Sequence, residues 1–288
     1  MVSSSRSSDD GLASAGGHPA GRSADATPSR LTAAFREGRP ALVAYLMAGY
    51  PDREGSLAAL EALVRGGADV IELGVPYGDP VADGPVIAEA GRVALDAGIG
   101  LVEALALART FTAAHADAPP IALMTYLNPM MRLGFARVAA LASEAGVAGF
   151  IVPDLPPDSP MAGRWLHEAQ PLGIDTVFLV APTSTDERLT AVGAASGGFV
   201  YVVSSLGVTG ERERIATSLG SLVSRARERT ALPVAVGFGV SSPEQAGEVA
   251  RLADGVVVGS AIVRRQADPA ALEAFVAELA SAVHRAGA

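Results

Sequence analysis

The feature that most constrains how this chain can fold is a repeat: a short apolar run, a loop rich in glycine, proline and aspartate, and a longer segment with helical spacing. The runs are rich in Val, Ile and Leu and continuously apolar, which is typical of parallel strands buried on both faces. Eight occur, at Ala41–Met47, Asp69–Leu73, Ile121–Thr125, Ala148–Val152, Thr176–Val180, Phe199–Val203, Val234–Gly237 and Gly255–Val258. Eight strand–helix units favour an α/β fold, a (β/α)8 TIM barrel.

The segments between the runs carry helix signals. Ser242-Pro243-Glu244-Gln245 combines an N-cap, a proline at the first helical position and a capping-box glutamine. Asp268-Pro269 begins another helix, and its apolar stripe consists of Leu272, Phe275, Val276, Leu279 and Val283. We therefore predict a single barrel domain over residues 29–288. An open, doubly wound sheet is the alternative that the repeat alone leaves open.

Residues 1–28 differ in character from the rest of the chain. They are rich in Ser, Gly, Ala and Asp and show no periodicity, so we predict a disordered tail. They lack the apolar core of a secretory signal, and Asp9, Asp10 and Asp25 argue against a plastid transit peptide. We expect a cytoplasmic protein.

Composition removes several classes of function. The net charge of −9 without a basic cluster argues against binding to nucleic acid or to an anionic membrane. No apolar run approaches the roughly 18 residues of a membrane span. The chain has no cysteine, and all 22 of its Lys and Arg residues are arginine. Without a lysine amine it cannot form a Schiff base with a substrate or hold pyridoxal phosphate covalently.

Glycines at three predicted strand ends suggest a phosphate site. Gly237-Phe238-Gly239 ends the seventh run, Gly259-Ser260 ends the eighth, and Gly207-Val208-Thr209-Gly210 follows the sixth. Glycine lets the backbone approach an anion, and loops after the seventh and eighth strands hold phosphate in many barrels. No arginine joins these glycines in sequence, so we expect binding to rest on backbone dipoles. The alternative is that they are turns and helix caps.

Two carboxyl groups stand out in ELGVPYGDPVADGP, residues 72–85, which follows the second apolar run. Strand alternation places Glu72 on the same face as Val70. If that face lines the barrel, desolvation raises the pKa of Glu72 towards neutrality, as a general acid or base requires. Asp83 lies in the stiff loop that follows. The alternatives are a capping or ion-paired role for Glu72 and a turn role for Asp83.

The remaining polar residues give weaker signals. Asp79 and Asp154 suit structural roles in loops. The histidines lie in the tail or in helical segments without metal-ligand spacing, so we expect no metal site; they are His18, His115, His167 and His284. Four polar side chains lie at or near strand ends, where they could either contact a ligand or pack in the core: Tyr45, Tyr126, Asn128 and Tyr201.

Six motifs, in order along the chain, resemble the tryptophan synthase alpha subunit family. They are ELGVPYGDPVADGP (72–85), MTYLNP (124–129), VPDLPP (152–157), GVTG (207–210), GFGVSSPEQ (237–245) and GSAIV (259–263). The resemblance runs from about residue 30 to the C-terminus. It implies a (β/α)8-barrel lyase that reversibly cleaves indole-3-glycerol phosphate to indole and D-glyceraldehyde 3-phosphate.

The resemblance implies a role for each carboxyl group. Glu72 matches the catalytic glutamate, which protonates the ring carbon that bears the side chain and helps remove the proton of the side-chain hydroxyl. Asp83 matches the aspartate that hydrogen-bonds the indole N–H. The substrate's own indole then serves as the electron sink, which fits a chain without lysine.

The resemblance also implies substrate-binding positions: glycines and neighbours for the phosphate, mostly apolar and aromatic residues for the indole, and Thr209 in a loop that closes over the site. Together with the strand-end candidates, the expected set is Tyr45, Ile87, Tyr126, Leu179, Tyr201, Thr209, Gly210, Gly237, Phe238, Gly239, Gly259 and Ser260. Two departures from the family pattern bear on the loops: Gly78 in place of serine, and Ser205-Leu206 in place of a more polar pair.

Finally, the resemblance implies a partner. This is a beta subunit that carries pyridoxal phosphate and joins indole to serine within an αββα assembly, so no cofactor is expected in this chain. The alternatives are a stand-alone lyase of the same family, a non-catalytic subunit that only activates the beta subunit, and another phosphate-binding barrel such as a sugar-phosphate isomerase.

Overall fold

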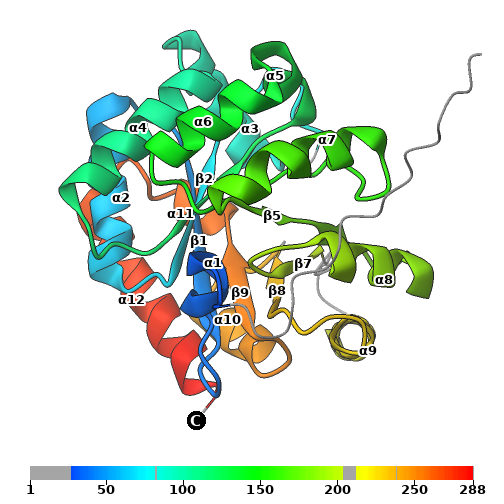
Figure 1. The fold of residues 1–288 in the computed structure, drawn as a ribbon. Coiled ribbons are helices and arrows are strands. Elements are labelled where there is room, and N and C mark those ends of the chain that lie inside the picture. The colour runs from blue at the N-terminus through cyan, green and yellow to red at the C-terminus, as the bar shows by residue number, and fades with distance from the viewer. Residues whose placement is uncertain (1–26, 82, 204–211, 238, 288) are drawn as a thin grey trace, which may run out of the picture.

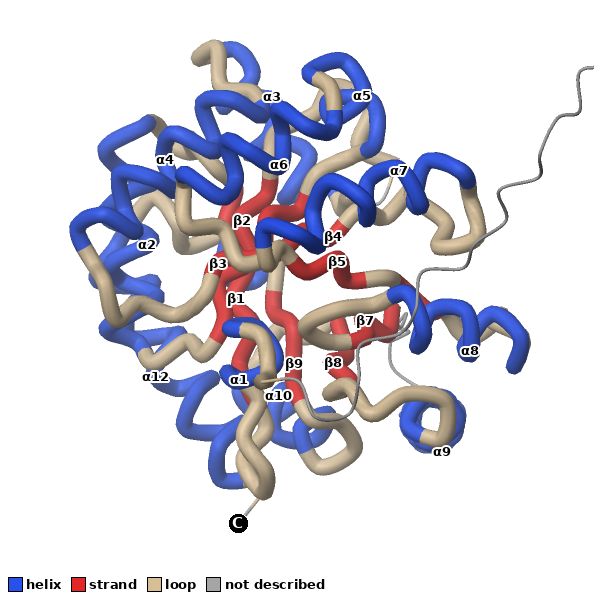
Figure 2. Tube along the Cα trace, viewed as in Figure 1, coloured by secondary structure: helices blue, strands red, loops and turns tan. Residues whose placement is uncertain are grey.

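The computed structural model describes residues 27–81, 83–203, 212–237 and 239–287, and its strands form a ring surrounded by helices (Figures 1 and 2). The strands are β1 (Ala41–Met47), β2 (Val70–Gly74), β3 (Ile121–Met124), β4 (Gly149–Ile151), β5 (Asp175–Val177), β6 (Leu179–Val180), β7 (Val200–Val203), β8 (Val234–Gly237) and β9 (Gly255–Val258). The helices are α1 (Arg30–Ala34), α2 (Arg53–Gly66), α3 (Pro85–Asp96), α4 (Leu101–Ala114), α5 (Leu127–Leu133), α6 (Phe135–Glu144), α7 (Pro160–Ala169), the 3-10 helix η1 (Gln170–Leu172), α8 (Asp186–Ala195), α9 (Arg212–Arg227), α10 (Pro243–Ala250), α11 (Ser260–Val263) and α12 (Pro269–Arg285).

The sheet closes on itself. The strand order is β5-β4-β3-β2-β1-β9-β8-β7-β6, and all neighbouring strands are parallel. Only Phe178 separates β5 from β6, so these two are halves of one strand position, the first paired with β4 and the second with β7. The predicted (β/α)8 barrel is therefore confirmed, and an open sheet is excluded.

The predicted strands coincide closely with the observed ones. β1, β8 and β9 match the predicted runs residue for residue, and the outer bounds of the others differ by one residue at one or both ends. The interruption at Phe178 was not predicted. It occurs where the backbone N–H of Phe178 donates to the Ser196 hydroxyl (3.4 Å), so that the chain changes strand partners there. The predicted tail, residues 1–28, lies outside the described residues except for Thr27 and Pro28.

The predicted helix starts and stripe are also present. The Ser242 hydroxyl caps α10 by accepting from the N–H of Gln245 (3.3 Å), and Asp268 caps α12 by accepting from the N–H of Ala271 (3.1 Å). The five residues of the predicted α12 stripe are all buried: Leu272, Phe275, Val276, Leu279 and Val283. They pack α12 against α2 and β1.

The end of the barrel at the strand N-termini is sealed by a short helix. In Figure 1, α1 lies across this end of the ring. Its Leu31 is fully buried, and a Cβ added at Gly149 or Gly198 would lie within 2.5 or 3.0 Å of the Leu31 side chain. The Thr32 hydroxyl also donates to the carbonyl of Gly198 (2.8 Å). This plug leaves the opposite end, at the strand C-termini, for a site.

One charged cluster fastens α12 to the same sealed end. Asp69 accepts from the N–H of Leu42 (2.8 Å), from His284 (2.7 Å) and from Arg39 (2.9 Å). His284, which the sequence placed in a helical segment, thus has a structural partner. Because three donors converge on one mostly buried carboxylate, the cluster favours this packing of α12.

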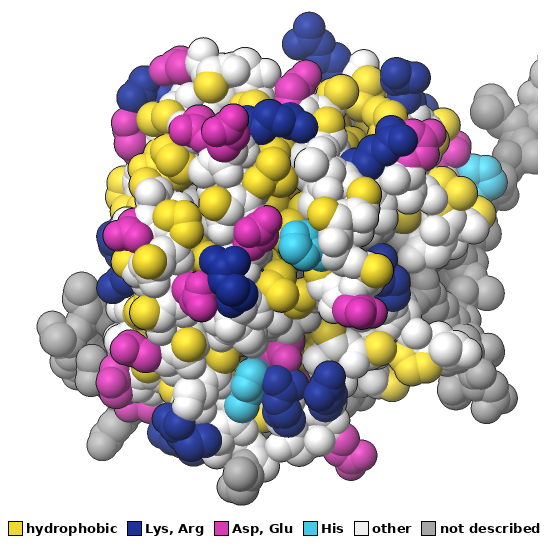
Figure 3. All heavy atoms as spheres, turned by 90° about the vertical axis from the view of Figure 1, so that its left-hand side faces the viewer, with side chains coloured by type: hydrophobic (Ala, Val, Ile, Leu, Met, Phe, Trp, Pro, Cys, Tyr) yellow, Lys and Arg dark blue, Asp and Glu magenta, His cyan; other side chains and the backbone are white. Residues whose placement is uncertain are grey.

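The outer face over α2, α4 and α12 carries charges of both signs among apolar side chains (Figure 3). Arg65 pairs with Glu273 (2.7 Å) and with Glu61 (3.6 Å), and His115 lies 3.7 Å from Glu61. These side chains are exposed, and exposed pairs contribute about 0–1 kcal/mol each. The barrel is therefore held mainly by its apolar core.

Candidate active site

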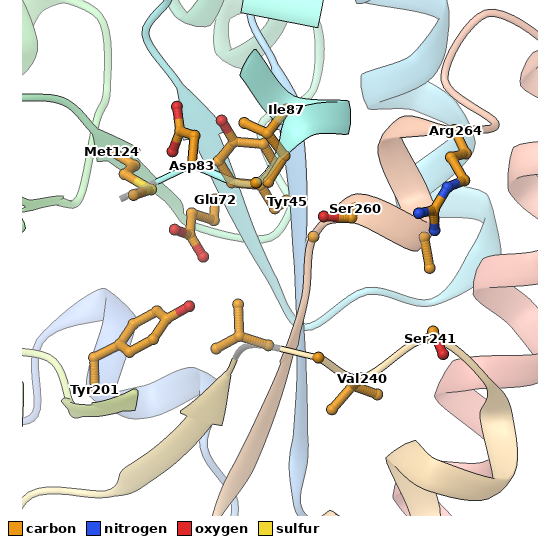
Figure 4. A pocket seen from close by; sticks show the side chains of 15 residues that line it. Tyr45, Glu72, Asp83, Ile87, Met124, Tyr201, Val240, Ser241, Ser260 and Arg264 are labelled. Carbon is orange, nitrogen blue, oxygen red and sulfur yellow. The ribbon is translucent and has the colours of Figure 1, made fainter. Parts of the chain in front are cut away.

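A cavity of about 370 Å³ lies at the C-terminal ends of the barrel strands. Side chains from the strands form its floor, and loops after β2, β8 and β9 form its walls (Figure 4). The lining residues are Tyr45, Glu72, Asp83, Gly84, Ile87, Met124, Tyr201, Gly239, Val240, Ser241, Val257, Gly259, Ser260, Ala261 and Arg264. Its place agrees with the general position of active sites in this barrel architecture.

Strand register brings Tyr45 and Glu72 together on the floor. Tyr45 on β1 is directly opposite Glu72 on β2, and Glu72 is opposite Ala122 on β3. Residues opposite each other on paired strands point to the same side of the sheet, here into the barrel. Tyr45 and Glu72 both line the cavity.

Two glycines at strand ends make room for tyrosine hydroxyls. A Cβ at Gly74 would collide with the hydroxyl of Tyr45, and a Cβ at Gly237 would collide with the hydroxyl of Tyr201. Both tyrosines are buried and line the cavity. Burial raises the pKa of each well above its ordinary value, and the neighbouring carboxyl groups raise it further, so both hydroxyls keep their protons.

Glu72 has lost almost all contact with water. Its exposed fraction is 1%, and among the described residues its Oε2 atom has no hydrogen-bond partner. Desolvation, with a further contribution from nearby Asp83, raises the pKa of Glu72 to about 8. At neutral pH this carboxyl group therefore carries a proton in most molecules. Among the described residues no cationic side chain forms an ion pair with Glu72.

Asp83 is held at the edge of the cavity by a turn and a tyrosine. Its backbone N–H donates to the carbonyl of Pro80 (3.1 Å), which turns the loop so that the carboxyl group faces Glu72. Burial raises the pKa of Asp83 to about 6, and a hydrogen bond donated by the Tyr126 hydroxyl acts in the opposite direction. Asp83 is therefore mostly ionised at neutral pH, whereas Glu72 is mostly neutral.

Tyr126 is itself fixed by a second layer of contacts. Its ring stacks on Tyr77, with centroids 4.9 Å apart, and the Asn128 amide donates to the Tyr77 hydroxyl (3.0 Å). Asp154 accepts from the N–H of Leu127 (2.9 Å), which ties the loop after β4 to the loop after β3. The loop role expected for Asp154 is confirmed.

The opposite side of the cavity is made by the loops after β8 and β9. Gly239 and Gly259 leave backbone exposed there, and Ser260 and Arg264 add side-chain donors. Arg264, which the sequence analysis did not consider beside these glycines, also lines the cavity. It follows Ser260 by four residues, so one turn of helix brings both to the same side. The four-residue spacing from Ser260 to Arg264 was the sequence feature that could have predicted Arg264 in this wall.

The expected site residues fall into three groups. Those that line the cavity are Tyr45, Glu72, Asp83, Ile87, Tyr201, Gly239, Gly259 and Ser260. Those that support it from outside are Tyr126, which bonds Asp83; Leu179, which pairs with Tyr201; and Gly237, which accommodates the Tyr201 hydroxyl. Those outside the described residues are Thr209, Gly210 and Phe238, together with Ser205-Leu206. The lining residues that were not anticipated are Gly84, Met124, Val240, Ser241, Val257, Ala261 and Arg264.

Within the described residues, no group of three His, Asp or Glu side chains is arranged to hold a metal ion. Within the same ranges, no helix combines the length and the apolar character needed to cross a membrane.

The fold and the cavity define a class: a (β/α)8-barrel enzyme whose pocket sets a neutral carboxyl group beside an ionised one, an arrangement able to give and take protons. More narrowly, the chain belongs to the tryptophan synthase alpha chain family, whose model matches residues 31–286. Its function is that of the alpha subunit, the lyase of the alpha reaction in tryptophan biosynthesis.

Individual relatives agree. The chain is 49% identical over 254 residues to the tryptophan synthase alpha chain of Acidothermus cellulolyticus. The aligned region covers 86% of this chain and 93% of the relative. The alpha chain of Streptomyces avermitilis is 47% identical over 261 residues, covering 88% and 92%. The structure is similar to tryptophan synthase from Mycobacterium tuberculosis (TM-score 0.81, 43% identity, 90% of this chain and 99% of that chain). It is also similar to subunit alpha from Legionella pneumophila (TM-score 0.81, 32% identity, 90% and 100%).

The space over Gly74 gives a test of how the cavity floor is built. We expect Gly74→Ala to lower the free energy of unfolding by about 1–3 kcal/mol, because the new methyl group displaces the Tyr45 hydroxyl. The matched control is Gly78→Ala, where nothing lies within 4 Å of an added Cβ, and we expect a change within about 0.5 kcal/mol. Urea unfolding of both variants measures the difference; equal stability would contradict the packing described.

Proposed function

We propose that the cavity binds indole-3-glycerol phosphate and cleaves it reversibly to indole and D-glyceraldehyde 3-phosphate, with Glu72 as acid and base and Asp83 as the charge partner of the indole ring. The observation that carries this proposal is the burial of the Glu72 carboxyl group next to Asp83. Burial raises the pKa of Glu72 to about 8 and that of Asp83 to about 6. Membership of the tryptophan synthase alpha chain family supports the choice of reaction.

The two sides of the cavity suit the two ends of this substrate. Tyr45, Tyr201 and Met124 surround the carboxyl groups and offer the apolar and aromatic surface that an indole ring requires, with Ile87 at the edge. Gly259 and Ser260 line the cavity where the loop after β9 meets it, and there the backbone and a hydroxyl can receive a phosphate. A volume of about 370 Å³ falls within the range of small-molecule sites, about 300–1,000 Å³.

In this proposal Glu72 donates one proton to the substrate and then accepts another proton from it. The neutral acid first protonates the indole carbon that bears the glycerol phosphate chain, which gives a cationic ring. The resulting carboxylate then removes the proton of the hydroxyl on the adjacent carbon. The electrons of that O–H bond form the aldehyde carbonyl, the carbon–carbon bond breaks, and its electrons restore the aromatic indole. Glu72 ends the cycle protonated, as it began.

Asp83 has a different task, because it keeps its charge. When the ring carbon is protonated, positive charge develops at the indole nitrogen, and an ionised carboxylate there stabilises it through a charged hydrogen bond. The hydroxyl of Tyr126 helps to keep Asp83 ionised despite burial. Two carboxyl groups thus take two roles because their surroundings differ.

The chain contains no lysine, so the reaction cannot pass through an imine with the protein. An aldol cleavage needs an electron sink, and the indole ring of the substrate supplies one. We infer that this chain uses no cofactor of its own. Pyridoxal phosphate would belong to a separate beta subunit that consumes indole, and we propose an αββα assembly of the two chains, acting in the cytoplasm.

Two alternatives predict different properties. A stand-alone lyase would release indole without binding a beta subunit. A non-catalytic subunit would have no need for a matched acid pair, whereas Glu72 and Asp83 are both present here and face the same cavity. The specific features of the site therefore favour a working lyase.

Replacement of Glu72 tests the proton-transfer role. We expect Glu72→Gln to keep its fold, because glutamine resembles the neutral acid in shape and charge, and to lose at least about 10²-fold in turnover. Indole release from indole-3-glycerol phosphate measures this, with circular dichroism as the check on folding. Glu89→Gln, an exposed change on α3 that breaks only a surface pair with Arg92, serves as the control. Near-normal turnover in Glu72→Gln would remove the mechanism.

The pH dependence follows from the two pKa values. Activity requires protonated Glu72 and ionised Asp83, so kcat/KM should fall below about pH 6 as Asp83 gains a proton and above about pH 8 as Glu72 loses one. Because the groups interact, the two limbs report apparent values of the pair. In Asp83→Asn we expect a lower plateau, by about 10- to 10²-fold, and loss of the acid limb. An acid limb that survives in this variant assigns it to another group.

Partner binding is tested separately from catalysis. In analytical ultracentrifugation we expect an equimolar mixture with a tryptophan synthase beta subunit to give one faster boundary with the mass of αββα. The chain alone at the same concentration is the reference. If the two proteins sediment independently while indole release persists, the chain is a stand-alone lyase.

A further inference from the structure

We propose that Arg264 is a specificity-determining residue that selects doubly charged phosphate at the far side of the cavity. This inference rests on the proposed phosphate position beside Gly259 and Ser260 and extends it, because it assigns to a side chain a recognition role otherwise left to the backbone. Arg264 is the cationic member of the described residues that line the cavity.

The position of Arg264 separates it from the acidic side. Figure 4 places it across the cavity from Glu72 and Asp83, on the same side as Ser260 and Ser241. Arg264 directly follows α11, and its backbone N–H donates to the carbonyl of Ser260 (3.1 Å). This backbone hydrogen bond across one turn of helix places both residues in the same stretch of the cavity wall.

Arg264 is also free to act on a ligand. Its side chain is exposed, and among the described residues it forms no ion pair and no hydrogen bond. The adjacent Arg265 is engaged: it donates to the carbonyl of Ala261 (2.8 Å), and its guanidinium lies 3.8 Å from the centre of the Phe275 ring. Two neighbouring arginines of the same charge are thus used differently, one for packing and one facing the cavity.

The hydroxyl groups nearby narrow the choice of donors further. The hydroxyl and N–H of Ser241 both donate to the Gln245 side chain (2.9 Å each), so the proton of that hydroxyl is already used. The Ser260 hydroxyl has no partner among the described residues. Ser260 and Arg264 are therefore the side-chain donors that this wall can direct at an anion.

Charge explains why a guanidinium is needed there. A phosphate monoester carries about −1.5 to −2 charges at neutral pH, and it must enter a protein of net charge −9 and a cavity that already holds ionised Asp83. Arg264 supplies a positive charge at the end away from Asp83. Its planar donors match phosphate oxygens, so it favours the dianion and sets which end of the substrate points inward.

The experiment compares two probes, inorganic phosphate and indole, on the intact chain. We expect Arg264→Gln to weaken phosphate binding about tenfold, to raise KM for indole-3-glycerol phosphate by a similar factor, and to change kcat by less than about threefold. Indole, which is uncharged, should bind as in the unaltered protein. Arg264→Lys keeps the charge and should recover most of the loss. The difference between Arg264→Gln and the unaltered protein should shrink as salt is raised.

The control is Arg251→Gln, which removes the same charge from an exposed arginine that caps the C-terminus of α10, outside the cavity lining. We expect it to leave phosphate binding unchanged. Phosphate affinity equal in the folded Arg264→Gln variant and the unaltered protein would overturn the inference, and so would an equal loss in Arg264→Lys. If the unaltered chain binds phosphate but does not cleave indole-3-glycerol phosphate, the proposed reaction fails and the role of Arg264 stands.

Discussion

The site depends on one constraint, the exclusion of water from the carboxyl group of Glu72. The group lies on the inner face of β2, opposite Tyr45 on one neighbouring strand and Ala122 on the other, and it is 1% exposed. An ionised carboxylate without solvent or a partner is costly, so the neutral form prevails at pH 7. The closed barrel creates this environment together with α1, whose buried Leu31 fills the end of the barrel at the strand N-termini.

The rest of the site arranges charge around that neutral acid. Asp83 stays ionised because its loop leaves it less deeply buried and Tyr126 donates to it, and Tyr126 is in turn held by Tyr77. On the opposite side, the described residues of the wall include no carboxyl group and do include Arg264. The cavity therefore has a negative and a positive end, and this polarity is the basis of the proposal that a ligand with an aromatic ring and a phosphate binds in one orientation.

Some features of the site have structural causes that sequence patterns do not separate from ligand binding. Gly74 and Gly237 both follow apolar residues at strand ends, and both are glycine because a tyrosine hydroxyl from the next strand occupies the space of a Cβ. A glycine at a strand end thus predicts close approach, but only the register of the neighbouring strand decides what approaches. The break at Phe178 likewise depends on a residue that is distant in sequence, because the N–H of Phe178 donates to the Ser196 hydroxyl instead of to a neighbouring strand.

The sequence by itself determined eight parallel strands covered on both faces, and period-two alternation placed Glu72 on one face with Val70. It left the choice between a closed barrel and an open sheet to the tertiary structure. Its motifs also determined the family. The tertiary structure decided what depends on separate segments meeting in space. It set the degree to which Glu72 is dehydrated, the bond from Tyr126 to Asp83, and the place of Arg264 in the cavity wall. Local periodicity reports which face a residue takes, whereas a pKa or a charge partner depends on distances between strands and loops far apart in the chain.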